Sequence, residues 1–187
     1  MRKLIYSMMV SLDGFVEDSR HSLEWVLIDR ELHQYINDQQ ASIGASLYGR
    51  GMYENMSAYW PTADTDPTLP DFVVEFAHIW RAMPKIVFSH TLEKVTGNSR
   101  LVKGNAVDTV QKLKAQPGKD LSLRGANLAA TFVRLNLIDE YQLFVQPIVL
   151  GSGTPYVPPG CDRLNLKLVD THTFASGVVL LRYQNRG

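Results

Sequence analysis

The sequence predicts an α/β layer fold in which strands are joined by crossover helices. Short apolar runs typical of buried strands alternate with helical periodicity along almost the whole chain of 187 residues. The C-terminal part is richer in strands, and the turn residues Ser176-Gly177 favour a hairpin there. Because no repeat or change of composition marks a boundary, residues 1–187 are expected to form a single domain.

The N-terminal half is expected to contain two strands and three helices. In order, they are a strand at 4–10, a helix from 29 with an apolar stripe at 32, 35, 36 and 43, a strand at 45–48, a helical run through 53–60 and a helix through 72–83. Asp29 stands where the first helix needs its N-cap. Pro61 and Pro84 end the two later helices, because proline lacks the amide hydrogen that a helix interior requires.

The C-terminal half is expected to continue the alternation and then to end in strands. In order, it contains strands at 85–89 and 100–103, a helix at 105–116, a strand at 120–123, a helix at 127–135 and strands at 140–145, 166–169 and 178–183. Asn105 and Asp108 resemble a capping box at the start of a helix. Asn136 follows the next helix at the position where asparagine can adopt the left-handed conformation.

Charge and cysteine content exclude several classes of protein. Nineteen basic residues balance nineteen acidic ones, so no basic field favours nucleic acid or an anionic membrane as partner. The single Cys161 can form neither an internal disulfide nor a thiolate zinc site, which favours the cytoplasm. The histidines lack metal-ligand spacing, so no metal is expected. No apolar run approaches the roughly 18 residues of a membrane span. A small molecule is the expected partner.

Three strand-to-helix junctions carry residues that suit a bound phosphate, because ligands of open α/β sheets bind beyond the carboxyl ends of strands. At Gly49-Arg50-Gly51, glycines open a helix and Arg50 adds a permanent charge. Gly125 follows a strand, and Asn127 can cap the next helix. Ser89-His90 offers a hydroxyl and an imidazole at another strand end. Taken alone, each junction is more often a tight turn or a surface cap than a ligand site.

The sequence lacks the residues that several other classes of enzyme need. A zinc deaminase needs several thiolates, and a nucleoside triphosphatase needs a Walker A motif, which the sequence does not contain. Gly151-Ser152-Gly153 has the wrong spacing for the nucleophile elbow of a hydrolase. The complete Gly-x-Gly-x-x-Gly fingerprint of the usual dinucleotide fold is also missing.

Taken together and in order, four segments resemble the dihydrofolate reductase-like superfamily. They are SLDGFVED (11–18), LYGRGMYE (47–54), KIVFSHTLE (85–93) and LRGANLAATFVRLNLIDEYQLFVQPIVLGSGTPYV (123–157). The most similar branch is the C-terminal reductase domain of the bifunctional deaminase-reductase of riboflavin biosynthesis, together with its stand-alone members. The resemblance implies a three-layer fold, with a mixed, mainly parallel central sheet flanked by helices and antiparallel strands at the C-terminal end.

The resemblance also implies NADPH-dependent reduction of a ribosylamino-pyrimidine or pteridine-like substrate, as in 5-amino-6-(5-phosphoribosylamino)uracil reductase. It assigns cofactor contacts to Gly49, Arg50, Gly51, Ser89, His90, Arg124, Gly125, Ala126 and Asn127. Ser11, Asp13 and Gly14 resemble the mobile loop beside the nicotinamide. Asp29 resembles the carboxylate that binds substrate and assists protonation, and it is interpreted equally well as a helix cap.

Three residues depart from the family pattern. Met52 stands where a hydroxyl residue is usual, His90 where arginine is common, and Arg124 where the family often has the first of two glycines. These departures keep two further hypotheses open. One is a protein that binds or senses NADP(H) without reducing a substrate, and the other is a dihydrofolate reductase.

A homodimer is expected from the apolar C-terminal part of the chain. Tyr141, Leu143 and Val145 alternate along a strand interpreted as an edge strand, and the segment 147–157 adds further apolar residues. The related reductase domains commonly pair through this end, so a two-fold homodimer is predicted.

Overall fold

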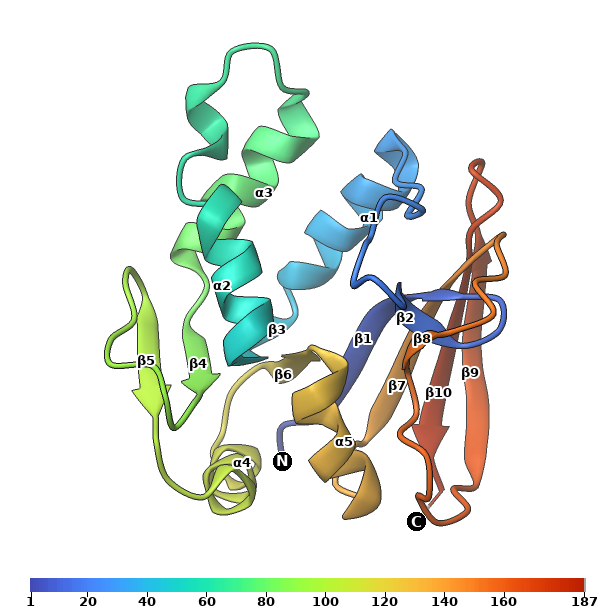
Figure 1. Ribbon diagram of the computed structural model, residues 1–187. Helices are drawn as coiled ribbons and strands as arrows, with labels where there is room; N and C mark the ends of the chain where they lie inside the picture. Colours follow the sequence, from blue (N-terminus) through green and yellow to red (C-terminus); the bar gives the residue numbers. More distant parts are fainter. Residues whose placement is uncertain (187) are drawn as a thin grey trace. The chain divides into compact units, whose positions relative to one another are not determined.

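The computed structural model describes residues 1–186 (Figure 1). The chain divides into two compact units, and each contains strands and helices. The first unit comprises Met1–Arg2 and Arg30–Gly125, and the second comprises Lys3–Asp29 and the chain from Ala126 onward. The α/β class is confirmed, with parallel strands along most of the chain and antiparallel strands at the C-terminal end. The single domain stays a prediction.

The first unit has four parallel strands in the order β5-β4-β3-β6. These strands are β3 (Ile43–Gly49), β4 (Lys85–Phe88), β5 (Ser99–Val102) and β6 (Asp120–Arg124). Its helices are α1 (Arg30–Gln40), α2 (Arg50–Tyr59), α3 (Asp71–Ala82) and α4 (Ala106–Ala115), with a short 3-10 helix η1 at Ala63–Thr65. β3 leads into α2 without an intervening loop, so the end of the strand and the start of the helix share one junction.

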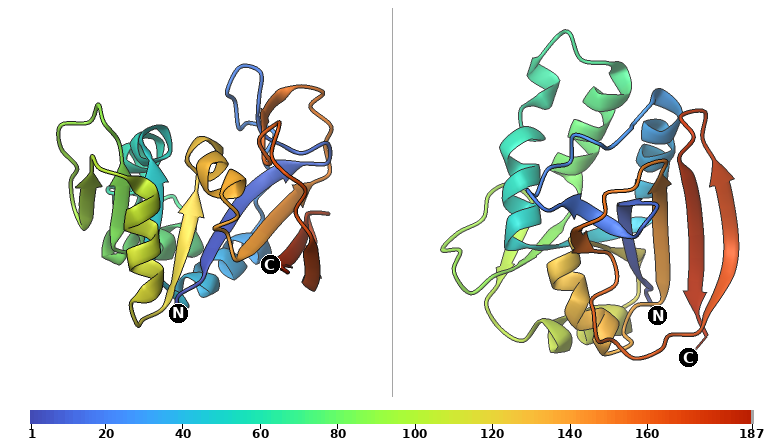
Figure 2. Two further views of the ribbon diagram at one scale, coloured as in Figure 1. Left: turned by 90° about the horizontal axis from the view of Figure 1, so that it is seen from below. Right: turned by 45° about the vertical axis from the view of Figure 1, so that its right-hand side comes forward.

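The second unit has the strand order β1-β7-β10-β9, in which β1 and β7 are parallel and the last two strands are antiparallel to their neighbours. Its strands are β1 (Leu4–Ser11), β2 (Phe15–Asp18), β7 (Glu140–Gln146), β8 (Gly153–Pro155), β9 (Leu166–Thr173) and β10 (Val179–Asn185), and its helix is α5 (Ala126–Arg134). β9 and β10, drawn in red, run side by side in Figure 2 and form the hairpin predicted around Ser176-Gly177.

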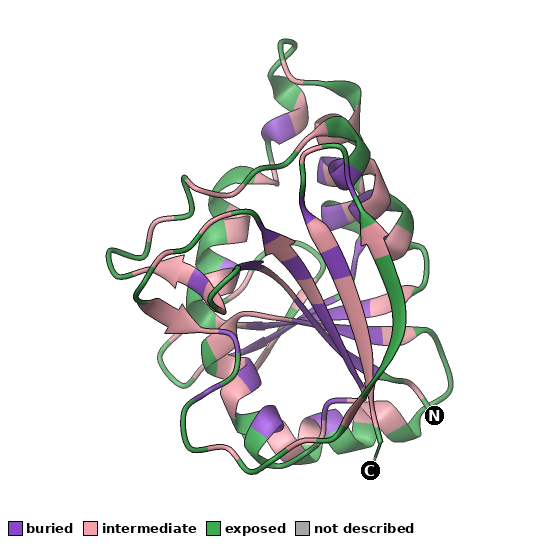
Figure 3. Cartoon of the chain, turned by 90° about the vertical axis from the view of Figure 1, so that its right-hand side faces the viewer, coloured by how far each residue is buried: buried purple, intermediate pink, exposed green. Residues whose placement is uncertain are grey.

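The strands carry most of the buried residues, which are coloured purple in Figure 3. Leu47, Leu121 and Leu123 of the first unit are fully buried, and so are Leu4 and Phe144 of the second. Strands buried on both faces are typical of parallel sheets covered by helices. The apolar runs that predicted strands therefore predicted the core as well.

Two helix ends confirm the capping predictions. The Asn105 side chain accepts hydrogen bonds from the backbone amides of Val107 and Asp108 at the start of α4. Asn136 adopts a left-handed backbone with φ of 52° after α5. The amide of Leu137 donates to the Phe132 carbonyl and that of Asn136 to the Val133 carbonyl, which is the Schellman pattern.

Two expectations about elements are corrected, and two short strands were not predicted. Ile43 does not extend the stripe of the first helix, because α1 ends at Gln40 and Ile43 begins β3. The strand of Tyr141, Leu143 and Val145 is not an edge strand, because β7 pairs with both β1 and β10. The short strands β2 and β8 pair with each other and are not apparent in the sequence pattern.

Replacing Gly153 by alanine should destabilise the protein more than the same change at Gly151. A Cβ at Gly153 would lie 1.9 Å from the Glu17 carbonyl oxygen, whereas a Cβ at Gly151 meets nothing within 4 Å. Gly151 has φ of +76°, so alanine there carries only the left-handed strain, about 1 kcal/mol. Gly153→Ala should cost about 3 kcal/mol or more, because backbone must move. Equal losses of unfolding free energy in urea would contradict this packing.

Candidate functional site

The three predicted junctions of the first unit meet at one edge of its parallel strands. β3 lies between β4 and β6, with Gly49 opposite Phe88 and Tyr48 opposite Arg124. Gly49-Arg50, Ser89 and Arg124-Gly125 therefore leave neighbouring strands at corresponding heights. Because this edge holds the carboxyl ends of the strands, it is where an α/β fold binds its ligand.

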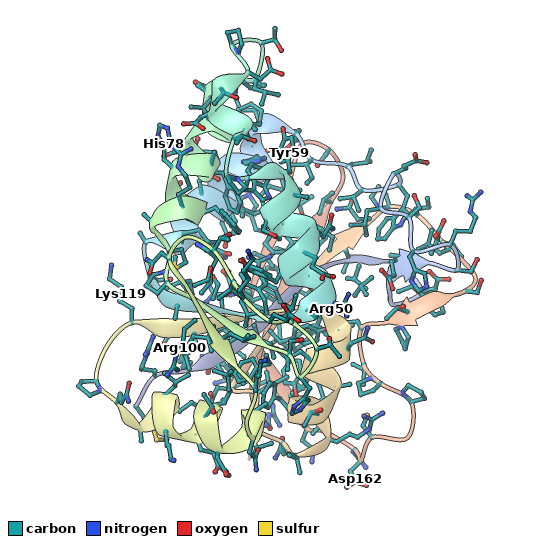
Figure 4. All side chains as sticks on the ribbon, turned by 60° about the vertical axis from the view of Figure 1, so that its left-hand side comes forward. Arg50, Tyr59, His78, Arg100, Lys119 and Asp162 are labelled. Carbon is teal, nitrogen blue, oxygen red and sulfur yellow. The ribbon has the colours of Figure 1, made fainter. Side chains whose placement is uncertain are left out.

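The first junction presents the start of α2 with a positive side chain beside it. Gly49 is the N-cap residue of the helix, and as a glycine it has no side chain to cap the first turn. Arg50, labelled in Figure 4, is exposed, and its Nε lies 2.9 Å from Glu54 Oε1 while Nη1 donates to Thr91 Oγ1 at 3.0 Å. Uncapped amides, the helix dipole and a guanidinium together favour an anion such as a phosphate. Thr91 was not predicted.

The second junction is a compact turn held by the Ser89 hydroxyl. Ser89 Oγ accepts hydrogen bonds from the amides of Thr91 at 3.2 Å and Leu92 at 3.0 Å. The Ser89 amide donates to the Val102 carbonyl at the end of β5. His90 is exposed next to it. Ser89 thus acts as the cap of its own turn, while its hydroxyl hydrogen and the His90 ring are the groups that a ligand can use.

The third junction brings α2 close to the turn after β6. Gly125 has φ of +96°, and a Cβ there would lie 3.3 Å from Met52 Cβ. Met52, which replaces the usual hydroxyl residue, therefore packs its stem against this glycine. Arg124 is half-buried, its Nε donates to Ser122 Oγ at 3.3 Å, and burial lowers the pKa of its guanidinium. Glycine is needed at 125 for both its conformation and its small size.

The predicted loop residues of the second unit form a network around Asp13. Ser11 Oγ donates to Asp13 Oδ1 at 2.7 Å and accepts from the Phe15 amide at 2.9 Å. Asp13 also accepts from the backbone amides of Leu150 at 3.1 Å and Gly151 at 2.7 Å. The Ser11 hydroxyl, followed by these amides, lowers the pKa of Asp13. Two of the four segments that carry the family resemblance are thus joined to each other.

Gly14, Ala126, Asn127 and Asp29 complete the predicted residues of the second unit. Gly14 has φ of +90°, and its carbonyl accepts from the Tyr156 amide at 2.8 Å. Ala126 and Asn127 form the first turn of α5, where Asn127 is exposed. Asp29 directly precedes α1 and is half-buried, so both its predicted roles, cap and substrate carboxylate, stay predictions.

The described residues contain neither a cluster of metal ligands nor a membrane-spanning helix. Residues 1–186 contain no group of three or more histidine, cysteine, aspartate or glutamate side chains able to hold a metal ion. Over the same range, no helix combines the length and the apolar character needed to cross a membrane.

Comparison with known proteins identifies the family to which this α/β site belongs. The sequence model of the RibD C-terminal domain matches residues 2–180. YyaP of Bacillus subtilis (strain 168), an uncharacterised protein, is 35% identical over 187 residues, which cover 100% of this chain and 96% of the relative. The chain therefore belongs to the RibD C-terminal domain family.

Solved structures support the same fold. A protein named for riboflavin biosynthesis from Shewanella sp. PV-4 matches with a TM-score of 0.77 and 22% identity over 100% of both chains. The deaminase/5-amino-6-(5-phosphoribosylamino)uracil reductase of Thermotoga maritima matches with a TM-score of 0.66 and 16% identity over 98% of this chain and 56% of that chain. Dihydrofolate reductase of Enterococcus faecalis, solved with NADP(H), matches with a TM-score of 0.63 and 10% identity over 99% of this chain and 97% of that chain. The dihydrofolate reductase-like fold is thus confirmed.

Replacing Asp13 by asparagine should loosen the segment at Leu150-Gly151. Asparagine keeps the shape but removes the charge that strengthens both backbone hydrogen bonds. Amide hydrogen exchange at 150 and 151 should become severalfold faster. Asp66→Asn is the matched control, because that carboxylate also has a lowered pKa but accepts only from Thr68 in its own loop.

The network around Asp13 also makes the stability of the protein depend on pH. The pKa of Asp13 is lower in the folded state than in the unfolded state, where it is about 3.9. The carboxylate therefore adds its full share to the free energy of unfolding above the unfolded-state pKa, and this share is lost as pH falls through the folded-state pKa. Exchange rates at 150 and 151 that are the same in wild type and Asp13→Asn at neutral pH would contradict the assigned role.

Proposed function

We propose that this protein is an NADPH-dependent reductase of a ribosylamino-pyrimidine or pteridine-like substrate. The observation that carries the proposal is the convergence of three junctions at one strand edge in the first unit. This edge offers the uncapped start of α2, the Arg50 charge, the Ser89 turn and the close backbone approach at Gly125. Such a combination fits a ligand with several phosphates and a ribose.

Family membership supports the reaction class. The Thermotoga relative is named as a 5-amino-6-(5-phosphoribosylamino)uracil reductase, and the Enterococcus relative was solved with NADP(H). Both are properties of those proteins, and extending them to this chain is part of the proposal. In the riboflavin reaction, the ribosyl group of the substrate is reduced to ribityl.

Each group of residues receives a role in this proposal. The amides of Gly51 and Met52, with Arg50, bind a cofactor phosphate, and Ser89-His90 contact the 2′-phosphate that distinguishes NADPH from NADH. The turn at Gly125, Ala126 and Asn127 lets backbone approach the cofactor. Bound NADPH supplies a hydride. Asp29 holds the substrate and delivers a proton to it, and the lone cysteine fits a cytoplasmic enzyme.

The direct test is NADPH oxidation with candidate heterocycles, alongside NADPH binding by isothermal titration. Binding together with substrate-dependent oxidation would support the reductase. Binding without oxidation of any candidate would favour an NADP(H)-sensing protein. Turnover of dihydrofolate alone would favour dihydrofolate reductase, and absence of NADPH binding would contradict all three functions.

Replacing Arg50 by alanine should weaken NADPH binding by about 1.5 to 3 kcal/mol, the range of a hydrogen bond to a charged group. This corresponds to a dissociation constant about tenfold to a hundredfold higher. Arg100→Ala is the matched control, because Arg100 is an exposed arginine of the same unit, on β5 (Figure 4). If both variants bind NADPH like wild type, Arg50 is not at the cofactor phosphate.

Replacing Asp29 by asparagine should lower turnover far more than NADPH affinity, because the proposed carboxylate faces substrate rather than cofactor. The measurement compares kcat with the dissociation constant of NADPH in both proteins. If Asp29 is only the cap of α1, Asp29→Asn should keep both its kcat and its melting temperature, because asparagine caps a helix as well as aspartate does. Asp29→Ala should then unfold at a lower temperature while its kcat is unchanged.

We also propose a homodimer, now with different supporting residues. β9 pairs only with β10 within residues 1–186, and its Leu168 and Val169 are exposed. Val149, with 64% of its surface exposed, and Val157 add apolar area in the segment expected to pair. Light scattering at micromolar concentration should give twice the mass of 21.1 kDa, and a monomer mass would exclude this assembly.

A further inference from the structure

One face of the parallel strands in the first unit carries polar residues where apolar ones are usual. Register places Ser46 opposite both Lys85 and Ser122, and Tyr48 opposite Arg124. Side chains two residues apart on a strand share a face, so these five residues lie on the same side. Tyr48 also packs against Tyr53 of α2, which shows that α2 covers this face.

Most buried charges of the molecule have strong partners. Lys85 is only 2% exposed, and its Nζ donates to the carbonyls of Trp80 at 2.5 Å and Met83 at 2.8 Å, at the end of α3. In the second unit, Glu140 is fully buried and accepts from Arg182 Nη2 at 2.9 Å. Glu140 thus has an ionic partner, whereas Lys85 has two carbonyl acceptors, and burial lowers the pKa of Lys85 to about 8.

Arg124 differs from these charges. Its guanidinium is half-buried, and within the described residues its hydrogen bond is the one from Nε to the neutral Ser122 Oγ. No carboxylate of residues 1–186 forms an ion pair with it. Burial lowers its pKa and the neighbouring Tyr48 raises it, yet an arginine remains charged at neutral pH. Both terminal nitrogens therefore retain donors that the protein does not use.

The neighbours of Arg124 are donors too. Trp80 is 6% exposed, and its indole Nε1 has the nearby Tyr48 hydroxyl as its acceptor within the described chain. The indole lies beside the Tyr48 hydroxyl, which faces Arg124 in turn. An indole N–H and a guanidinium can only donate, and a phenol can donate. An anion beside Arg124 would supply oxygen acceptors for the guanidinium and for the Tyr48 hydroxyl.

We propose that Arg124 binds an anionic oxygen group of the substrate, either a carboxylate or a phosphate. A half-buried guanidinium whose terminal nitrogens have no ionic partner gains two parallel, charge-assisted hydrogen bonds when it meets an anion. Arg124 is placed for this role because it ends β6, directly before the turn at Gly125. The inference rests on the proposed function, since it assigns the anion to the molecule that is reduced, in place of the cofactor contact that the family resemblance implies for Arg124.

The binding test uses inorganic phosphate and benzoate as separate probes at constant ionic strength, with chloride as the reference salt. Isothermal titration is run on wild type, Arg124→Gln, Arg124→Lys and the exposed-arginine control Arg100→Gln. Arg124→Gln should weaken binding of the preferred probe about tenfold or more, while Arg100→Gln leaves it unchanged and Arg124→Lys weakens it less. The tighter wild-type probe identifies phosphate or carboxylate as the recognised group.

A stability measurement separates this role from a structural one. If Arg124 is retained for a ligand, Arg124→Met should melt at the same temperature as wild type or higher without anion, because an apolar side chain replaces an uncompensated charge. The rise in melting temperature that the preferred anion gives to wild type should be absent in Arg124→Met. A large loss of thermal stability without anion would overturn the proposal.

The remaining outcomes also decide the question. Unchanged anion binding in Arg124→Gln, or loss of all anion binding in Arg50→Gln alone, would overturn the proposal by placing the anion at the start of α2. NADPH binding that weakens in Arg124→Gln as much as in Arg50→Ala would overturn it by placing Arg124 at the cofactor. Failure of the reductase proposal has a different signature. In that case wild type does not bind NADPH, while the dependence of anion binding on Arg124 can still be measured.

Discussion

Parallel pairing of β4, β3 and β6 is the constraint on which the candidate site depends. Parallel strands present all their carboxyl ends at one edge, so three loops far apart in sequence begin at neighbouring positions. α2 starts directly after β3, and its first turn reaches the glycine that follows β6. A shift of one residue in the register would move Arg124 to the opposite face and separate it from Tyr48.

Features governed by neighbouring residues were predicted well from the sequence. The cap at Asn105 and the left-handed Asn136 follow from side chains and backbone within one turn of a helix. The end of α1 was not predicted correctly, because the position of Ile43 fits a helical stripe and a strand equally well. Pairing of β3 with β6, which sets Ile43 opposite Asp120, decides between them. β2 and β8 were not predicted, because each has so few residues that only their pairing with each other defines them as strands.

In the candidate site too, features set by neighbouring residues were predicted and features set by distant residues were not. Gly49, Arg50, Ser89 and Gly125 were recognisable as residues at strand ends, and the register then brought them together. The partners of Asp13 were not recognisable, because they are backbone amides 137 and 138 residues away, and an amide has no sequence signature. Thr91 lies two residues after Ser89 and could have been found from the pattern of a serine or threonine turn.

The departures from the family pattern have opposite physical consequences. Met52 is an apolar substitute that packs against Gly125, so it strengthens the junction while giving up a hydroxyl. Arg124 brings a charge into a face already occupied by Lys85, and the described chain supplies no carboxylate to balance it. Like charges on one face repel each other, so the anion proposed for Arg124 would stabilise the folded state by offsetting this repulsion. The substrate of this family member is therefore expected to differ from those of relatives with glycine at this position in the group that meets Arg124.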